Sequence, residues 1–211
     1  MSGRYEELLD YNRRWAAGHV EEDPAYFERM AEGQHPDFLF IGCSDSRVSA
    51  QELTGTHLGE MFIHRNIANL VVHTDINLMS VLQYAVDVLE VGHVIVCGHF
   101  QCGGVRAAVD GHFHGLIDKW LRTIKDVYRI YRDELDAIAD PEERHHRLVE
   151  LNVREQVFRL RTTSFVQRAI RDRDLQVHGW VYDLEHGLIR DLRIDPATDF
   201  DAVSLYDYDD L

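Results

Sequence analysis

The sequence predicts an α/β fold with a mainly parallel central β-sheet, an antiparallel C-terminal extension, flanking helices and an N-terminal helical arm. Two short apolar runs, residues 38–41 and 93–97, each lead into a polar loop that contains glycine, as buried strands of a parallel sheet do. An apolar pattern of helical spacing from Ile76 to Leu89 lies between them and supplies the helix of a crossover connection. Two later strands, 176–183 and 187–192, are close enough in sequence to pair antiparallel.

Two helices are expected ahead of the first strand, and we take residues 1–33 as a helical arm. The first is indicated by apolar residues that fall roughly on one helical face, namely Leu8, Leu9, Tyr11 and Trp15. Asp23 and Pro24 mark the start of the second, which carries Tyr26, Phe27 and Met30. The aromatic side chains of this arm need burial, either on the chain's own sheet or on a partner chain, and the sequence does not choose between them.

The remaining elements follow in order. A second strand covers residues 60–64, Thr74 or Asp75 caps the crossover helix, and Gly103 opens another helix. One long amphipathic helix is expected from Leu116 to Leu135. A second begins at Asp140-Pro141 and continues to Ser164. The acidic segment 195–211 is expected to be a solvated or loosely docked tail, and residues 1–211 are taken as a single domain.

Composition limits the classes of function. At 211 residues with 45% hydrophobic residues, the chain can bury one large core. Its formal net charge of -15 argues against a nucleic-acid partner, which would require clustered Lys and Arg. Three cysteines do not resemble a disulfide framework, and neither a signal peptide nor an apolar run of about 18 residues is present. We therefore expect a cytoplasmic protein that neither binds nor crosses a membrane.

Two strand ends carry residues that suit a metal ion. Cys43 follows the first apolar run, and His99 and Cys102 follow the run at 93–97. Two thiols and one imidazole suit zinc, whose catalytic sites use three protein ligands and leave a fourth position for water or substrate. Asp45 and Arg47, beside Cys43, add an acid-base pair that a structural zinc would not need. The alternative is that the histidine and cysteines only pack the loops, and that the Asp-Arg pair only braces its loop.

With these residues the sequence closely resembles the β-class carbonic anhydrases, especially those of bacteria and plants. The resemblance covers nearly the whole chain and rests on these segments: Gln34-His35-Pro36, Cys43-Ser44-Asp45-Ser46-Arg47, His64-Arg65-Asn66-Ile67-Ala68-Asn69, Gly98-His99-Phe100-Gln101-Cys102-Gly103-Gly104 and His178-Gly179-Trp180-Val181-Tyr182-Asp183. It implies reversible hydration of carbon dioxide to bicarbonate and a proton. Cys43, His99 and Cys102 would hold one Zn²⁺ per chain, and that ion would acidify the attacking water.

The resemblance also assigns roles to other positions. Asp45 and Arg47 would form the dyad that orients the attacking water. The substrate pocket would include Gln34, Phe62, Tyr84 and Gly103, although ordinary core packing is the alternative for Phe62 and Tyr84. Independently of the resemblance, Cys97 inside its apolar run is interpreted as a small buried hydrophobic residue.

Two further properties follow from the family. Some members have a non-catalytic bicarbonate site built from a Trp, an Arg and a Tyr. Arg65 and Tyr182 match two of these residues, but Phe40 stands in place of the Trp and has no N–H donor. The family's basic unit is a dimer whose N-terminal helices wrap the neighbouring chain, so we expect a homodimer or a higher even oligomer. One of several histidines would pass protons to buffer, and the sequence does not identify it.

Two other functions remain open at this stage. A zinc site of this type also suits a carbonyl sulfide or carbon disulfide hydrolase of the same fold, which would differ mainly in pocket access and assembly. A non-catalytic zinc-binding regulatory protein is the second alternative. Asp45, Arg47 and the open fourth ligand position argue against it.

Overall fold

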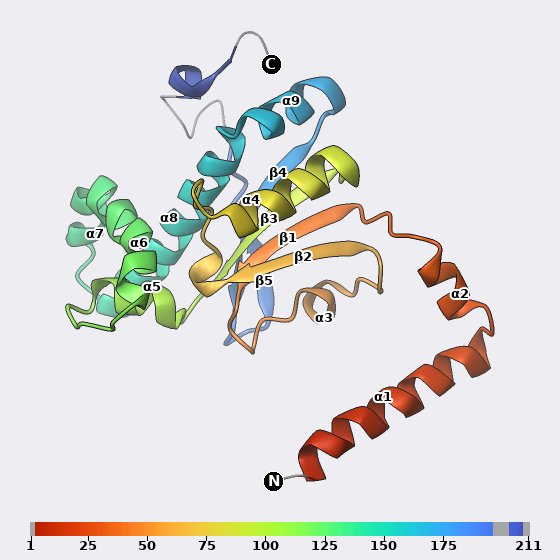
Figure 1. Cartoon of the computed structure of the whole chain (residues 1–211). Helices are drawn as coiled ribbons and strands as arrows, with labels where there is room; N and C mark the ends of the chain where they lie inside the picture. The colour runs from red at the N-terminus through yellow and green to blue at the C-terminus, as the bar shows by residue number, and fades with distance from the viewer. Residues whose placement is uncertain (1–2, 196–202, 209–211) are drawn as a thin grey trace. The chain divides into compact units, whose positions relative to one another are not determined.

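The computed structural model describes residues 3–195 and 203–208 (Figure 1). The chain forms two compact units, Met1–His35 and Pro36–Leu211. The first unit contains the two predicted helices, α1 (Gly3–Glu22) and α2 (Tyr26–Ala31). They pack through aromatic rings: Trp15 lies 5.7 Å from Phe27, and His19 stacks on Tyr26 at 4.4 Å between ring centroids. Within this unit α1 has no buried residue, so its apolar side chains stay exposed there.

The second unit is built on a five-stranded sheet of order β2-β1-β3-β4-β5. The strands are β1 (Phe38–Cys43), β2 (Met61–Asn66), β3 (His93–His99), β4 (Gln176–Asp183) and β5 (Leu188–Asp191). The first four in this order run parallel, and only the β4–β5 pair is antiparallel. The predicted α/β fold and its antiparallel C-terminal extension are therefore confirmed.

Helices surround this sheet in the second unit. They are α3 (Ala50–Thr54), α4 (Ile76–Gln83), α5 (Gly103–Val109), α6 (Ile117–Ile130), α7 (Arg132–Ala137), α8 (Pro141–Arg161) and α9 (Ser164–Arg173). Three short turns complete the list: the 3₁₀ turns η1 (Ile67–Asn69) and η3 (Val203–Tyr206), and the π-helical turn η2 (Tyr84–Val88), which continues α4. In the described part of the chain, no helix has the length and apolar composition needed to cross a bilayer.

The two faces of the sheet bury different clusters. Leu39, Ile41 and Val96 lie in the main core, to which α4, α6 and α8 contribute. Phe40 and Ile95 point to the other face and pack in a smaller cluster that includes residues of α3. This alternation is the period-two pattern of strands, and it leaves Cys43 on the side of the main core.

Helix α8 crosses β3 and β4 at close range because both strands have a glycine beneath it. A Cβ atom on Gly98 would lie 2.6 Å from Val153 Cγ2, and one on Gly179 would lie 3.1 Å from Val153 Cγ1. Side chains at these positions would push the helix off the sheet. The glycines therefore set the depth at which α8 packs, and α8 in turn contacts the loop beside the candidate ligands.

Two predicted helices are divided in the structure, so those predictions were wrong in extent. The stretch 116–135 breaks at Tyr131 into α6 and α7, because Tyr131 has φ -102° and ψ 26°, outside the helical region. The Tyr131 hydroxyl donates to Glu155 Oε1 of α8 at 2.7 Å. The helix from Asp140 ends at Arg161, where the Thr163 hydroxyl donates to the Arg159 carbonyl at 2.9 Å. Ser164 therefore begins α9 instead of continuing α8.

The predicted caps of α4 and α8 were confirmed, whereas the predicted start of α2 at Asp23 was wrong, because Ala25 is its N-cap and no side chain caps it. The predicted acidic tail is only partly described. The Asp75 carboxylate accepts from the Asn77 amide and caps α4, and Asp140 caps α8. Residues 196–202 and 209–211 of the tail lie outside the described residues. Within the described part, the carbonyl of Tyr206 accepts from Gln167 Nε2 at 2.8 Å.

Candidate metal centre

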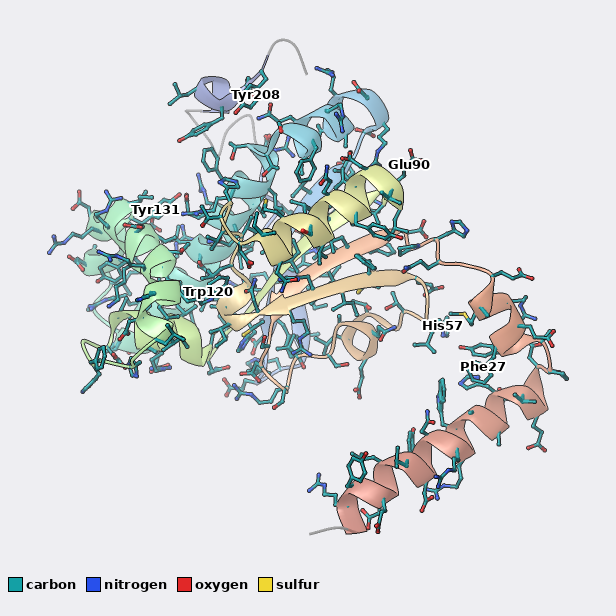
Figure 2. All side chains as sticks on the ribbon, in the orientation of Figure 1. Phe27, His57, Glu90, Trp120, Tyr131 and Tyr208 are labelled. Carbon is teal, nitrogen blue, oxygen red and sulfur yellow. The ribbon has the colours of Figure 1, made fainter. Side chains whose placement is uncertain are left out.

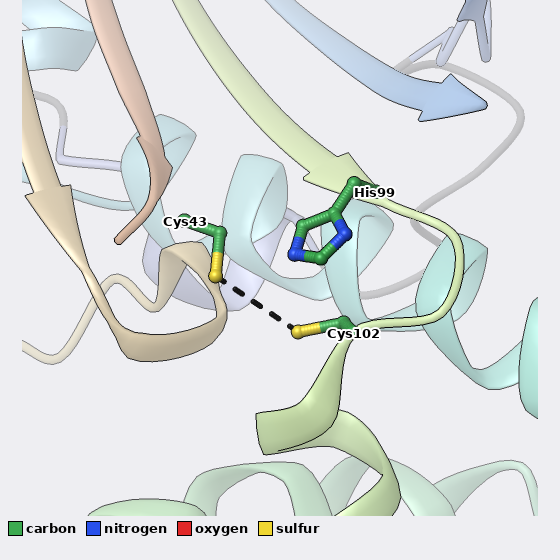
Figure 3. A group of neighbouring side chains, drawn as sticks. All are labelled: Cys43, His99 and Cys102. Atoms are coloured by element: carbon green, nitrogen blue, oxygen red, sulfur yellow. Dashed lines mark hydrogen bonds between the residues drawn. The ribbon is translucent and has the colours of Figure 1, made fainter. Parts of the chain in front are cut away.

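The three predicted ligands come from the carboxyl ends of two neighbouring parallel strands. Cys43 ends β1 and His99 ends β3, while Cys102 directly precedes α5. Because β1 and β3 are hydrogen-bonded neighbours, their carboxyl ends meet at one edge of the sheet, where sites form in such folds. Figure 3 shows the three side chains pointing toward one another. The structure thus places Cys43, His99 and Cys102 in one group, as the sequence analysis expected.

Their donor atoms have the spacing of a metal site. All three residues are buried, and their ligand atoms lie within 4.8 Å of one another. The sulfurs of Cys43 and Cys102 are 4.0 Å apart. Zn–S bonds of about 2.3 Å at the tetrahedral angle would place two sulfurs roughly 3.8 Å apart. The observed separation therefore suits two thiolates bound to one cation.

His99 presents an unused ring nitrogen to this cluster. Its Nδ1 lies 2.8 Å from the carbonyl of Phe100, so Nδ1 carries the proton and donates it. Its Nε2 is buried and has no hydrogen-bond partner among the described residues. Buried polar atoms are normally satisfied, and an imidazole held by its other nitrogen is the usual arrangement of a histidine ligand. These residues therefore fit a metal ion.

The two thiols differ in acidity. The hydrogen bond with Cys102 lowers the pKa of the Cys43 thiol to about 4, and the Ala68 amide, 3.4 Å from Cys43 Sγ, also favours the thiolate. The same contact, together with burial, raises the pKa of Cys102. Cys43 thus ionises readily, and a divalent cation would have to displace the proton of Cys102.

The third cysteine stays outside the site. Cys97 is fully buried in the cluster on the opposite face of the sheet, and burial raises the pKa of its thiol to about 12. It therefore remains a protonated, apolar side chain, as the sequence predicts. All three cysteines are thiols and none forms a disulfide.

Asp45 and Arg47 form a closed pair beside the cluster. Arg47 Nε and a terminal nitrogen donate to the two Asp45 oxygens at 2.9 and 2.7 Å, and the Arg47 amide adds a third bond at 3.0 Å. These bonds hold the pKa of the Asp45 carboxyl well below its usual range. Asp45 Oδ2 lies 3.7 Å from His99 Nε2. The ionised Asp45 carboxylate thus lies beside His99 Nε2, the candidate ligand atom that has no hydrogen-bond partner among the described residues.

Arg65 of β2 holds the loop that carries this pair. Its Nε donates to the Cys43 carbonyl at 2.9 Å, and a terminal nitrogen donates to the Asp45 carbonyl at 2.5 Å. The Ser44 amide adds a bond to the Asn66 carbonyl at 2.9 Å. The loop is therefore held to β2 at Cys43, Ser44 and Asp45.

The turn η1 approaches the cluster in an unusual conformation. Ala68 and Asn69 have φ angles of 64° and 50°, the left-handed region that residues other than glycine rarely adopt. This conformation aims the Ala68 amide at Cys43 Sγ. The Asn66 side chain spans the turn, since its amide nitrogen donates to the Leu70 carbonyl and its oxygen accepts from the Leu70 amide, both at 2.8 Å.

Helix α8 supports the same turn through buried amides, which the sequence reasoning missed. Asn152 Nδ2 donates to the Ala68 carbonyl at 3.2 Å, and Gln156 Nε2 donates to Asn152 Oδ1 at 3.0 Å. The Val71 amide donates to Gln156 Oε1 at 2.8 Å. The sequence did contain a signal for this support: Asn152 and Gln156, four residues apart, interrupt the apolar face of the helix.

The predicted pocket residues are distributed over several elements. Phe62 on β2 and Tyr84 in η2 lie 5.9 Å apart between ring centroids; Phe62 is half-buried and Tyr84 is 43% exposed. Gly103 opens α5 next to Cys102. Gln34 belongs to the first unit, and its structure is described only within that unit. Phe62 and Tyr84 thus lie close together within the second unit.

The predicted bicarbonate residues lie on three strands. Phe40 of β1 and Tyr182 of β4 are buried in the same small apolar cluster. Arg65 of β2 donates to two backbone carbonyls, as described above. Phe40 offers apolar contact only, because it has no N–H group.

Fold and site together define an α/β protein with a cysteine-histidine cluster that could hold a metal ion at the edge of a parallel sheet. The family model for carbonic anhydrase matches residues 38–189. The carbonic anhydrase of Emericella nidulans is 47% identical over 204 residues, which cover 96% of this chain and 90% of that protein. The chain belongs to the β-carbonic anhydrase family.

Solved structures agree with this assignment. One of two tetrameric β-carbonic anhydrases from Sordaria macrospora superposes with a TM-score of 0.87 at 40% identity, covering 91% of this chain and 98% of that chain. The β-carbonic anhydrase CafA of Aspergillus fumigatus superposes with a TM-score of 0.89 at 38% identity, covering 96% of each chain. The resemblance predicted from the motifs is therefore confirmed.

Proposed function

We propose that this protein catalyses the reversible hydration of carbon dioxide to bicarbonate and a proton, with one Zn²⁺ per chain held by Cys43, His99 and Cys102. The observation that carries the proposal is the meeting of two buried thiols and one unpartnered imidazole nitrogen within 4.8 Å. Membership of the β-carbonic anhydrase family supports the same reaction.

The donor set favours zinc among divalent metals. Thiolate sulfur and imidazole nitrogen suit this ion, and three protein ligands are typical of its catalytic sites. When bound, zinc supplies a Lewis acid that makes a water molecule acidic enough to attack carbon dioxide near neutral pH. The protein's own contribution is to hold three ligands in fixed geometry on a rigid sheet edge.

Asp45 and Arg47 orient the attacking water in this proposal. The Asp45 carboxylate can accept a hydrogen bond from that water, which directs the oxygen lone pair toward the substrate carbon. Arg47 keeps Asp45 ionised through the hydrogen bonds that lower its pKa. In related enzymes the Asp at this position can also bind the metal and exclude water. If Asp45 did so here, this acceptor would be lost and activity would fall at low pH.

The pocket for carbon dioxide is proposed to include Phe62, Tyr84, Gly103 and Gln34. Carbon dioxide is small and apolar, so aromatic walls with few polar groups suit it. The ring contact between Phe62 and Tyr84 supports a shared apolar wall. The assignment of Gln34 rests on the family resemblance alone.

The test combines metal analysis with turnover. Purified protein should contain one zinc per chain and hydrate carbon dioxide in a stopped-flow assay with a pH indicator. Cys102→Ala should lose both zinc and activity, while Cys97→Ala is the matched control, since it removes a buried thiol from the opposite face of the sheet. Folded, metal-free protein would refute the proposal.

The same preparation distinguishes the other functions. Turnover of carbonyl sulfide or carbon disulfide that exceeds carbon dioxide hydration would favour the hydrolase. Zinc-loaded protein without turnover of any of the three substrates would indicate the regulatory protein. Asp45→Ala provides the finer comparison, because it should keep zinc and lose activity only if the dyad acts in the reaction.

We further propose a homodimer or a higher even oligomer in the cytoplasm. The exposed apolar residues of α1, among them Tyr5, Leu8 and Tyr11, favour burial against a second chain. A related β-carbonic anhydrase is tetrameric, which supports an even assembly. Three unpaired thiols favour a reducing compartment. Light scattering that detects only monomer would contradict the assembly.

A bicarbonate site at Arg65 and Tyr182 is a weaker proposal. Arg65 already donates to the carbonyls of Cys43 and Asp45, which favours a role in holding the loop. If bicarbonate binds there, it should inhibit wild-type protein and Tyr182→Phe differently. Equal inhibition of the two proteins would leave Arg65 with the positioning role alone.

A further inference from the structure

A second site is suggested by a cavity in the helices that pack beside α8. The cavity has a volume of about 780 Å³ and is lined by residues of α5, α6, α7 and α8. Figure 1 shows α5, α6 and α7 grouped at one side of the sheet, and Figure 2 labels Tyr131, where α6 ends. None of Cys43, His99 and Cys102 lines this cavity. It is therefore distinct from the candidate metal centre.

The break at Tyr131 shapes this cavity. Tyr131 has a non-helical backbone where α6 ends and α7 begins, and its hydroxyl donates to Glu155 of α8. As a result, Arg132 and Asp136 of α7 line the same space as Lys125 and Tyr128 of α6. A continuous helix would carry the residues after Tyr131 onward along one axis. The prediction of one continuous helix over 116–135 was therefore wrong at the place where α6 and α7 together line the cavity.

The cavity wall is positively charged, although the chain carries a net charge of -15. Five wall residues are basic, namely Arg106, Lys125, Arg129, Arg132 and Arg144. Two are acidic, namely Asp110 and Asp136. A local excess of cations on an acidic protein indicates an anionic ligand.

Part of this positive charge has no acidic partner. Arg106 is paired with Glu142, Arg129 with Asp126 and Arg132 with Asp136. Arg144 donates to the Ile138 carbonyl at 3.0 and 2.6 Å, and its charge also helps to lower the pKa of the Asp136 carboxyl. Among residues 3–195 and 203–208, no carboxylate forms a direct ion pair with Lys125 or Arg144. A ligand would therefore not have to displace a direct carboxylate partner from either side chain.

A buried histidine on the same wall has no partner. His145 is 6% exposed, and neither of its ring nitrogens has a hydrogen-bond partner within the described part of the chain. Burial lowers the pKa of His145 to about 4, so at neutral pH the ring is uncharged and offers one N–H donor. Buried polar groups are normally satisfied by a partner. Both nitrogens are also shielded from solvent in this structure, so the ring lines the cavity without presenting a donor to it.

We propose that this cavity binds a small organic anion that carries carboxylate or phosphate oxygens. Lys125 and Arg144 would bind the oxygens. Val109 and Leu148, with the ring of Tyr128, provide apolar wall for the organic part of the ligand. The volume greatly exceeds that of an inorganic ion, which favours an organic anion. The inference does not depend on the reaction proposed above.

Calorimetric titration of the full-length protein tests the proposal. The probes are citrate for the carboxylate chemistry and phenyl phosphate for the phosphate chemistry, with inorganic phosphate and chloride at matched ionic strength. At least one organic probe should bind saturably, once per chain, and more tightly than either inorganic ion. Binding of citrate alone or of phenyl phosphate alone identifies which oxyanion the site prefers. If neither organic probe binds below about 10 mM, the proposal is wrong.

Variants distinguish specific binding of the anion in the cavity from its non-specific electrostatic attraction to the protein surface. Lys125→Gln should weaken binding about tenfold, since it removes one charge-assisted bond. Lys119→Gln is the matched control, because Lys119 is an exposed lysine of the same helix that does not line the cavity. Equal weakening by both variants would overturn the proposal. Lys125 is exposed, so Lys125→Gln tests a position that folding does not need.

Discussion

The buried amide Asn152 should control metal affinity although it is too remote to be a ligand. Asn152→Leu removes two hydrogen bonds, one to the Ala68 carbonyl and one from Gln156. Gln156 Nε2 keeps its bond to the Asn152 backbone carbonyl at 3.2 Å, so the main unsatisfied group is the buried Ala68 carbonyl. Leaving one such group without a partner costs about 1–3 kcal/mol of stability.

The effect on the metal follows from the position of the Ala68 amide. That amide lies 3.4 Å from Cys43 Sγ and helps to hold the thiolate, so a displaced turn weakens a ligand. Loss of a group that supports a ligand typically costs about 10- to 100-fold in metal affinity. We expect Asn152→Leu to weaken zinc binding within this range, measured by competition with a chelator.

The control separates positioning from general destabilisation. Val157→Ala truncates a buried residue of the same helix that forms no side-chain hydrogen bond, and should lower the free energy of unfolding in urea. Its zinc affinity should stay unchanged. If both variants weaken zinc binding in proportion to their loss of stability, the reasoning about the Ala68 turn is refuted.

Three other predictions concern the dyad, the α8 packing and a helix cap. Arg47→Gln should raise the pKa of Asp45 toward its usual value of about 4, so the acid limb of the activity profile moves to higher pH; an unmoved limb would exclude the pair from the reaction. The stability that this pair contributes is present above the unfolded pKa and is lost as pH falls through the folded one, so urea unfolding of wild type and variant should converge in acid. Gly98→Ala should cost about 1–3 kcal/mol by overpacking, and adding Val153→Ala should recover part of it, as measured by urea unfolding. Asp140→Ala should lower the free energy of unfolding by about 1 kcal/mol, because it removes the cap of α8; no change in the urea midpoint would contradict that role.

The sheet and the ligands were predictable because short-range patterns encode them. The strands at 38–41 and 93–97 were recognisable as apolar runs followed by glycine loops. Parallel neighbours bring their carboxyl ends together, so Cys43 and His99 had to meet if the strands were adjacent. The structure extends both strands by about two residues, to include Cys43 and His99 themselves. Ends of elements are the part that sequence patterns define least.

The divided helices were not predictable from periodicity. The apolar spacing from 116 to 135 is continuous, and α6 and α7 each keep it. At the break Tyr131 leaves the helical region and donates to Glu155, which lies 24 residues later on another helix. Hydrophobic spacing carries no information about such a tertiary hydrogen bond. The cavity beside the break was invisible to sequence reasoning for the same reason.

The supports of the metal centre show a further limit of motif reasoning. Left-handed Ala68 and Asn69 cost about 1–3 kcal/mol each, so other contacts must hold the turn. Trp120 Nε1 donates to the Ile67 carbonyl at 2.8 Å from one side, and Asn152 donates to Ala68 from the other. These contacts come from α6 and α8, outside the motif that contains Cys43. The motif therefore predicts which atoms bind the metal, whereas the acidity of the thiol and the rigidity of its surroundings depend on helices far away in the sequence.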